Sequence, residues 1–288
     1  MTSIRVITES TADLPKDLAA KYQIKVIPMS VEIDGQTYID GETITPTEIY
    51  QKMRSEGVVP KTTQITPAQY IKVFREVLDK GETPVYIGFS SQLSGSYQSS
   101  VVAANSFAPG TVFTLDTKAA SLGEGLLALE AAKMAETGHS PSEIIDSVAT
   151  KAKTLEHLVI VDTLEFLAKG GRLSTTKAFV GNILNLKPLI HVVDGALIPL
   201  ETARSRKKGL KRLVELMLER GKDLTIQTIG ISHADNLETV EELKTLITAE
   251  TGVTDFIISD IGATIGAHAG PGTVAFFFYG YQQGGVQS

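Results

Sequence analysis

The stretch FSSQLSGSYQSS, residues 89–100, gathers hydroxyl groups where a strand is expected to end and a helix to begin. It follows the run VYIGF, whose unbroken apolar character is typical of a strand buried on both faces. Ligands of open α/β sheets bind beyond the carboxyl ends of the strands, and the free N–H groups at a helix N-terminus favour anions. We therefore expect Ser90, Ser91, Ser94, Ser96 and the Gly95 amide to lie at this edge of the sheet, where they are suited to bind an anionic group. A serine-rich helix start without a ligand is the alternative interpretation.

A serine in this stretch is also a candidate nucleophile. The nucleophile elbow of α/β-hydrolases requires G-x-S-x-G, because the glycines allow the sharp turn that exposes the serine. Here Gln92 stands two residues before Ser94, and Ser96 stands two residues after it. The pattern favours hydroxyls that bind without reacting. It leaves a serine hydrolase or acyl transferase that uses Ser94 with His268 as the second hypothesis.

His268 lies in TIGAHAGPG, residues 264–272, among glycine and alanine residues. Glycine costs backbone entropy, so such a cluster usually marks tight turns or a close approach of the backbone to another group. We expect a loop in which Gly270 and Gly272 let the backbone and His268 come close to a strand or to a ligand.

Two further segments place polar groups beside expected helices. KTTQITP carries Thr62 and Thr63, which are neutral hydrogen-bonding groups in a loop between helices, or part of a simple polar linker. KGGRLS places Arg172 after two glycines, and an apolar helix face is expected after it, made of Phe179, Ile183, Leu184 and Leu186.

The run ETARSRKKGLKR, residues 201–212, is basic although the chain as a whole is acidic. Such a run is usually a solvated helix face. It is also suited to dock an acidic partner or a phosphorylated ligand, because a cluster of positive charge attracts anions. Arg204 and Arg206 are the candidate docking residues.

The sequence offers little for a metal or a nucleotide. Cysteine is absent, which excludes thiolate ligands and thiolate catalysis, and the five histidines form no HxH or HxxxH pair. No P-loop motif occurs. GEGLLA at 123–128 matches G-x-G-x-x-A but does not directly follow a strand, so we interpret its glycines as points of close helix packing. We expect no metal and no cofactor.

Composition narrows the class of protein further. The chain has 288 residues, with 27 Lys and Arg against 33 Asp and Glu, and a net charge of −6. This balance argues against nucleic acid as the main partner, because nucleic-acid binding requires a basic surface. No apolar run is long enough to span a membrane, and the N-terminus lacks the apolar core of a signal peptide. We expect a cytoplasmic protein without stable membrane insertion.

Short apolar runs alternate with helical stretches along the chain. Three helix starts are capping boxes with proline in the first turn, at 45–48, 66–69 and 140–143. Asp34-Gly35 and Asp194-Gly195 predict hairpin turns. The expected strands are 4–7, 24–33, 85–89, 112–115, 158–161, 189–193, 228–231, 255–259 and 273–280.

This alternation predicts an α/β fold of two domains. Residues 1–158 are expected to form an α/β/α three-layer domain with a mainly parallel sheet and the hydroxyl-bearing loops. Residues 159–288 contain a hairpin and a glycine-rich segment that leads into the expected strand VAFFFYG. They predict an α/β two-layer domain with a mixed sheet.

Taken in order, these motifs resemble those of the DegV family, the bacterial fatty-acid-binding proteins. The resemblance extends over nearly the whole chain: VITESTADLP, PKTTQITP, SSQLSGSYQSS, TLDTKAASLGEGLL, KGGRLS, LNLKPLI with DGALIP, ARSRKK and IGATIGAHAGPG. Each motif is weak alone, but their order and spacing together are specific. One loop departs from the family, which commonly has Thr-Ser-Gln-Pro where this chain has Thr62-Thr63-Gln64-Ile65.

The resemblance implies a long-chain fatty acid held at the junction of the two domains. It implies that Thr62, Ser94 and Gly95 bind the carboxylate and that His268 lies nearby. In some members a kinase partner uses ATP to convert the bound acid into an acyl phosphate for phospholipid synthesis. The arginine matching Arg204 is connected with that step. The protein itself would be a carrier, not an enzyme, and a sensor of another apolar acid is a third hypothesis.

Overall fold

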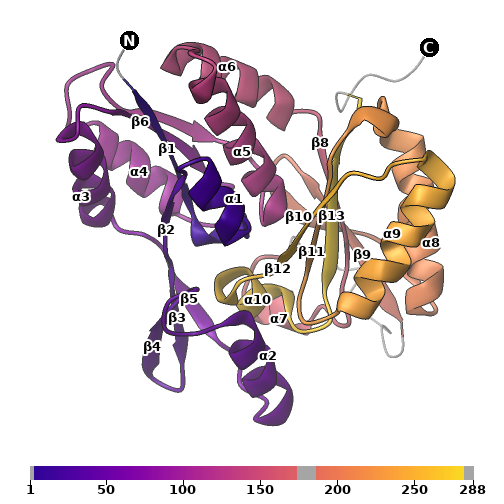
Figure 1. Ribbon diagram of the computed structural model, residues 1–288. Coiled ribbons are helices and arrows are strands. Elements are labelled where there is room, and N and C mark those ends of the chain that lie inside the picture. The colour runs from indigo at the N-terminus through magenta and orange to yellow at the C-terminus, as the bar shows by residue number, and fades with distance from the viewer. Residues whose placement is uncertain (1–2, 174–185, 282–288) are drawn as a thin grey trace.

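The computed structural model describes residues 3–173 and 186–281 of the chain (Figure 1). Three sheets of four, six and three strands organise these residues. The α/β class predicted from the sequence is confirmed. The helix face predicted at Phe179, Ile183 and Leu184 lies outside the described residues.

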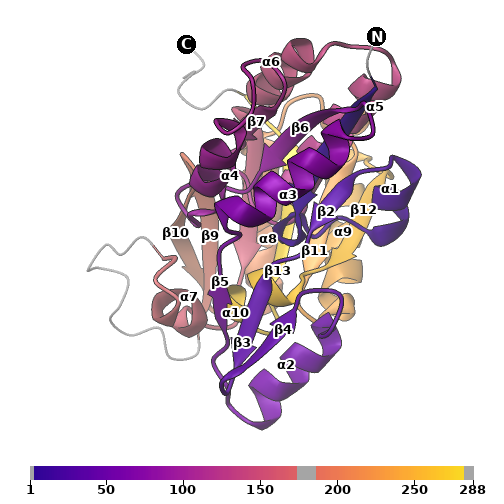
Figure 2. The same ribbon diagram turned by 90° about the vertical axis from the view of Figure 1, so that its left-hand side faces the viewer.

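The four-stranded sheet is entirely parallel and lies between two layers of helices (Figures 1 and 2). In spatial order its strands are β2 (Lys25–Ile27), β1 (Ile4–Glu9), β6 (Thr83–Gly88) and β7 (Phe113–Asp116). On one face lie α3 (Pro67–Leu78) and α4 (Ser96–Ala104), and on the other lie α1 (Lys16–Lys21), α5 (Leu122–Glu136) and α6 (Pro141–Ala152). A turn of 3-10 helix, η1 (Ser10–Ala12), follows β1.

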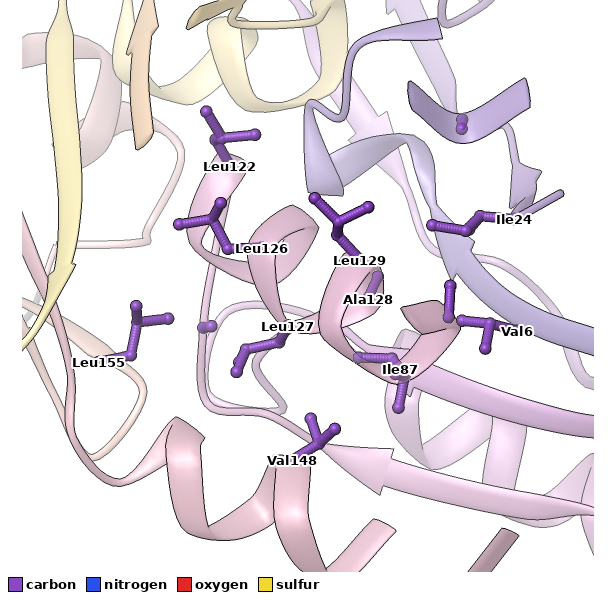
Figure 3. Packing of buried hydrophobic residues seen from close by; sticks show 14 of the residues in the cluster. Val6, Ile24, Ile87, Leu122, Leu126, Leu127, Ala128, Leu129, Val148 and Leu155 are labelled. Carbon is purple, nitrogen blue, oxygen red and sulfur yellow. The ribbon is translucent and has the colours of Figure 1, made fainter. Parts of the chain in front are cut away.

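Alternate residues of the central strands enter the two helical layers, because side chains alternate between the faces of a strand. Val6 and Ile87 pack in the core that α5 and α6 share (Figure 3). Ile7 and Tyr86 pack in the opposite core, against α3 and α4. Burial of both faces explains why the sequence of these strands is apolar without alternation.

The six-stranded sheet is mixed, as predicted, since only its last two strands pair in parallel. Its spatial order is β10 (Ala196–Ala203), β9 (Lys187–Val193), β8 (Leu155–Ile160), β13 (Val274–Tyr279), β11 (Ile229–His233) and β12 (Phe256–Asp260). The helices α8 (Arg206–Arg220) and α9 (Leu237–Thr251) cover one face, and a 3-10 turn, η3 (Leu224–Ile226), follows α8 (Figure 1). The predicted domain boundary between residues 158 and 159 lies inside β8. A boundary that keeps every strand of the six-stranded sheet in one domain would lie before Leu155.

The other face of the six-stranded sheet packs against α5, which therefore contacts both large sheets. Leu155 and Phe277 belong to the same core as Leu126 of α5. A Cβ atom added to Gly123 would lie 2.5 Å from His157 Nε2, so this glycine lets α5 approach β8 closely. The close helix packing predicted for GEGLLA is confirmed.

The three-stranded sheet is antiparallel, with β4 (Gln36–Ile39), β3 (Ser30–Ile33) and β5 (Lys61–Thr63) in that order, beside α2 (Pro46–Ser55). The single strand predicted over 24–33 is wrong. The chain leaves the four-stranded sheet after Ile27 and enters the three-stranded sheet at Ser30. Pro28 stands between them and has no N–H group with which to continue a ladder.

The local signals of the sequence are confirmed where they begin helices and turn hairpins. The capping boxes form at the starts of α2, α3 and α6, on Thr45, Thr66 and Ser140. Asp34-Gly35 joins β3 to β4 and Asp194-Gly195 joins β9 to β10, with positive φ at all four residues. Two successive positive φ angles are typical of the hairpin turn that Asp-Gly favours.

The glycine-rich segment around His268 is a helix, α10 (Ala263–Ala269), so the predicted loop is wrong. Gly270 follows it with a φ of 80°, which only glycine adopts readily. A Cβ atom on Gly266 would lie 2.3 Å from Tyr50 Oη, and this hydroxyl donates to the Ile261 carbonyl at 2.7 Å. The small residues therefore let α10 pack closely on α2.

Two aspartates of the N-terminal half hold the start of α10. Asp13 accepts a hydrogen bond from the Gly262 N–H at 2.8 Å. The two oxygens of Asp40 accept from the N–H groups of Ala263 at 2.8 Å and Thr264 at 3.0 Å. The first N–H groups of a helix have no partner within it, and a negative charge at this end is favourable. The carboxylates therefore position the helix that carries His268.

We expect Asp40→Ala to lower the free energy of unfolding by about 2 kcal/mol, because two buried N–H groups lose their acceptor. Urea denaturation measures the change. Glu42→Ala is the matched control: Glu42 is an exposed acid in the same loop, and its loss should change stability by less than about 0.5 kcal/mol. Equal stability of the two variants would contradict the capping role of Asp40.

Candidate functional site

A cavity of about 210 Å³ lies against the face of the six-stranded sheet that α8 and α9 do not cover. Its walls are mainly apolar, and they come from β8, β9 and β13 together with the segment before α4 and with α10. Polar groups interrupt this lining at a few points. Representative apolar residues of the wall are Phe89, Leu93, Val159, Val161, Ile190 and Phe277.

Thr62 and His268 meet at this cavity although 206 residues separate them in the chain. Thr62 lies on β5 of the small sheet, and His268 lies in the last turn of α10. The Thr62 Oγ1 and His268 Nε2 atoms are 2.8 Å apart. Thr63, the next residue of β5, is exposed and does not line the cavity, because neighbouring residues of a strand face opposite sides.

The surroundings of His268 favour one tautomer. Its Nδ1 atom is buried and has no hydrogen-bond partner among the described residues. It faces Gly170 so closely that a Cβ atom there would lie 2.1 Å away. A proton on Nδ1 would leave a buried N–H without an acceptor, which proteins rarely tolerate. We assign the proton to Nε2, which donates to Thr62 and leaves the Thr62 hydroxyl proton free for another acceptor.

Burial of the imidazole and, next, the charge of Arg172 lower the pKa of His268 to about 4. The last turn of a helix favours a positive charge, but here desolvation opposes it and is the larger effect. His268 is therefore neutral at physiological pH. Arg172 itself is fixed by the backbone, because its Nε donates to the Leu93 carbonyl at 3.1 Å and its Nη1 to the Gly170 carbonyl at 2.6 Å.

Ser94 and Gly95 line the same cavity at the start of α4. Ser94 Oγ accepts the Ser96 N–H at 3.1 Å and donates to Ser96 Oγ, also at 3.1 Å. The Gly95 N–H donates to no acceptor in the described part of the chain. A Cβ atom on Gly95 would lie 2.1 Å from Gln64 Oε1, so glycine is needed for Gln64 to lie across this turn.

The structure thus brings five of the predicted site residues to one cavity: Thr62, Ser94, Gly95, Arg172 and His268. Other predicted residues lie elsewhere. Ser91 accepts from Lys118 at 2.6 Å, away from the cavity lining. Gly270 and Gly272 allow close packing of Phe166 and Asp162 and do not line the cavity. Ser96 contacts Ser94 from behind and is buried.

The two arginines of the basic run differ in their surroundings. Arg204 is exposed in the turn before α8. Arg206, the first residue of α8, is paired with Asp162 at 2.7 Å. Lys187 binds the same carboxylate, so this acid neutralises part of the local positive charge. Arg204 is therefore better placed than Arg206 to meet an anionic partner.

Three residues that matter for the site were not predicted from the sequence. Asp13 and Asp40 fix α10, but both contacts join segments more than two hundred residues apart and leave no local pattern. His157 also lines the cavity, where burial lowers its pKa to about 4, and it accepts the Ala120 N–H at 3.3 Å. A lone histidine in an apolar strand gave no signal of this position.

A family model described as "Uncharacterised protein, DegV family" matches residues 3–280. The chain belongs to the DegV family. A DegV domain-containing protein of Caldanaerobacter subterraneus subsp. tengcongensis is 36% identical over 278 residues, which cover 96% of this chain and 99% of the relative.

Solved DegV structures share the fold over their full length. A DegV family protein from Thermus thermophilus, described as binding fatty acid, has a TM-score of 0.91 and 34% identity, and the match covers 97% of this chain and 100% of that one. DegV of Bacillus subtilis, described as a fatty acid binding protein, has a TM-score of 0.85 and 29% identity with the same coverage.

The geometry of this DegV protein gives no support to the serine hydrolase hypothesis. A catalytic triad needs a histidine that takes the serine proton and an acid that binds the other ring nitrogen. Here His268 contacts Thr62 through Nε2, and Nδ1 has no acid beside it among the described residues. Ser94 donates to Ser96.

No helix in the described ranges is long and apolar enough to cross a bilayer. The same ranges hold no cluster of three or more acidic or histidine side chains suited to a metal.

We expect the His268 imidazole of the DegV protein to titrate near pH 4 in an NMR experiment, far below its ordinary value of 6.5. Arg172→Gln should raise this pKa but not restore the ordinary value, because burial, the larger cause, remains. The unfolded chain takes up this proton at a higher pH than the folded chain. His268 therefore lowers stability as pH falls through 6.5 towards 4. A midpoint near 6.5 in the wild type would contradict the buried, neutral imidazole.

Proposed function

We propose that the protein binds a long-chain fatty acid in this cavity and presents its carboxylate to an ATP-dependent kinase partner. The observation that carries the proposal is the meeting of neutral hydrogen-bond donors, Thr62 with His268 and Ser94 with Gly95, on a largely apolar cavity. The description of two DegV structures as fatty-acid-binding supports it.

The proposed head-group site consists of donors without a full ion pair. The Thr62 hydroxyl has a free proton in the assigned tautomer, and the Gly95 N–H has no other acceptor in the described chain. A carboxylate leaving water needs such donors, because without them it would take up a proton. Arg172 lies at the same cavity, and its charge favours an anion there.

The proposed acyl-chain site is the apolar wall of β8, β9 and β13. Burial of each methylene group contributes about 0.8 kcal/mol, so a chain of about sixteen carbons gains on the order of 10 kcal/mol before the costs of ordering. The tail would therefore dominate affinity, and the polar groups would set the orientation.

The proposed kinase step extends this function from binding to presentation. The observation in its favour is an exposed Arg204 beside α8, on a protein whose net charge is negative. The partner would supply ATP and form the acyl phosphate, and the DegV protein would supply an oriented carboxylate. Because ATP is a cytoplasmic substrate, this role would place the protein in the cytoplasm. The protein would act as the lipid-presenting subunit and not as an enzyme by itself.

We expect purified protein to bind about one long-chain fatty acid per chain, and Thr62→Val to weaken that binding by roughly 10-fold to 150-fold, the equivalent of one lost hydrogen bond to a charged group. Fluorescence displacement or calorimetry measures the dissociation constant. Thr63→Val is the matched control, since Thr63 is exposed beside Thr62 on the same strand. Absence of fatty-acid binding would contradict the proposed function, and equal effects of the two variants would contradict the head-group site.

We expect Arg204→Ala to leave fatty-acid affinity unchanged and to lower acyl-phosphate production by a cognate kinase at least tenfold, because a rim charge contributes mainly to association. Lys72→Ala, which removes an exposed positive charge from α3, is the control and should retain full turnover. Equal turnover by Arg204→Ala and wild type would remove Arg204 from the partner surface.

A further inference from the structure

Two glutamates behind the head-group site are completely buried. Glu9 ends β1, and Glu124 lies in the first turn of α5. Both bind hydroxyl groups, and no lysine, arginine or histidine of the described chain pairs with either of them. Thr11 contacts both, at 3.4 Å from Glu9 Oε2 and 3.0 Å from Glu124 Oε2. Two neighbouring carboxylates out of water cannot both keep a charge cheaply.

The two hydrogen bonds of the Thr8 hydroxyl indicate that Glu124 is protonated and neutral. Thr8 Oγ1 lies 2.9 Å from the Ile87 carbonyl oxygen and 2.8 Å from Glu124 Oε1. A carbonyl only accepts and a hydroxyl has a single proton, so both contacts are hydrogen bonds only if Glu124 is protonated and donates to Thr8. Burial, together with the negative charge of Glu9, raises the pKa of Glu124 well above its ordinary value, which agrees with this assignment.

Glu9 is then the charged member of the pair. The phenol groups of Tyr70 and Tyr86 both donate to its Oε1 atom. Burial raises the pKa of Glu9, and hydrogen bonds from Tyr70, Tyr86, Thr11 and Ser96 oppose the rise. Glu9 therefore carries a charge that hydroxyl groups alone stabilise, and such a charge is sensitive to any further anion nearby.

Ser96 joins Glu9 to the cavity. It accepts from the Ser94 hydroxyl at 3.1 Å and from the Ile65 N–H at 3.2 Å, so its own proton is left for a further acceptor. Glu9 is that acceptor, since a hydrogen bond with Ser96 is one of the interactions that lower the pKa of Glu9. While Glu9 is charged, the proton of Ser94 points to Ser96 and not to the cavity. If Glu9 gains a proton and donates it to Ser96, the direction reverses, and Ser96 donates to Ser94. The Ser94 proton is then free for a ligand.

We propose that Glu9 is a positioning residue that takes up a proton when the fatty-acid carboxylate binds, and that this proton turns the Ser94 hydroxyl toward the ligand. The inference rests on the proposed function. The arriving carboxylate adds a second negative charge near a buried one, and protonation of Glu9 removes the conflict. No bond other than the O–H bond of Glu9 is formed, and solvent supplies the proton.

The sign of the pH dependence follows from this uptake. Binding should tighten as pH falls, by up to tenfold per pH unit, between the pKa of Glu9 in the complex and its lower pKa in the free protein. Glu124 already holds its proton, and burial raises the pKa values of the Tyr70 and Tyr86 phenols, so these groups bind no further proton. Burial also raises the pKa of Asp13, so this carboxyl group and His268 at the head group are the competing acceptors.

Calorimetry of dodecanoate binding, below its critical micelle concentration and in buffers of different ionisation enthalpy, counts the protons taken up. We expect the wild type to take up close to one proton per ligand at a pH between the pKa of Glu9 in the free protein and its higher pKa in the complex. Glu9→Gln should take up close to none. Glu124→Gln is the matched control, because an amide replaces a carboxyl group that is already neutral, and it should behave as the wild type.

Binding without proton uptake at any pH would overturn the inference and leave the proposed function intact. Uptake that persists in Glu9→Gln would assign the proton to Asp13, to His268 or to the ligand and would overturn the inference as well. A wild type that binds no fatty acid would overturn both. If Glu9→Gln does not fold, Tyr70→Phe removes one donor to Glu9 and should move the pH dependence to higher pH, and an unchanged profile would contradict the role of Glu9.

Discussion

The hydrogen bonds from Asp13 and Asp40 to the first N–H groups of α10 determine where His268 lies. A helix of seven residues is too short to be stable alone, because the cost of its first turn is repaid only by a longer helix or by tertiary contacts. Here the contacts are two carboxylates at one end and the packing of Gly266 on Tyr50 along one side. His268 follows at the other end, one turn after Thr264.

The same constraint connects the three sheets. Asp40 directly follows β4 of the three-stranded sheet, and Thr62 lies on β5 of the same sheet. When the aspartates hold α10, Thr62 and His268 come within 2.8 Å, and the face of β8 and β13 closes the cavity behind them. Neutral donors at such a site orient an anion without the strong attraction of a full ion pair. In the proposed function, such moderate binding suits a carboxylate that a kinase partner must reach.

The sequence predicted the parts of this arrangement that depend on local chemistry. Capping boxes at Thr45, Thr66 and Ser140 and the two Asp-Gly turns formed as predicted, because each depends on four neighbouring residues. The parallel sheet was predicted because burial on both faces removes the alternation of apolar and polar residues. The mixed sheet was predicted because the Asp194-Gly195 hairpin requires an antiparallel pair of strands. The strand over 24–33 was wrong because its two halves join different sheets, and the loop around His268 was wrong because distant aspartates stabilise a helix there. The meeting of Thr62 with His268 could be predicted only from the resemblance to a family. Glu9 and Glu124 gave no signal at all, because their pairing depends on tertiary packing.

The central claim is the orientation of a fatty acid in the cavity, and a crystal structure with a fatty acid brominated at its terminal carbon tests it most directly. The anomalous signal of bromine locates the tail without ambiguity. The account predicts bromine against the wall of Val159 and Phe277, and carboxylate oxygens about 2.7–3.2 Å from Thr62 Oγ1 and Ser94 Oγ. Bromine beside Thr62 and His268, or a ligand outside the cavity, would contradict it.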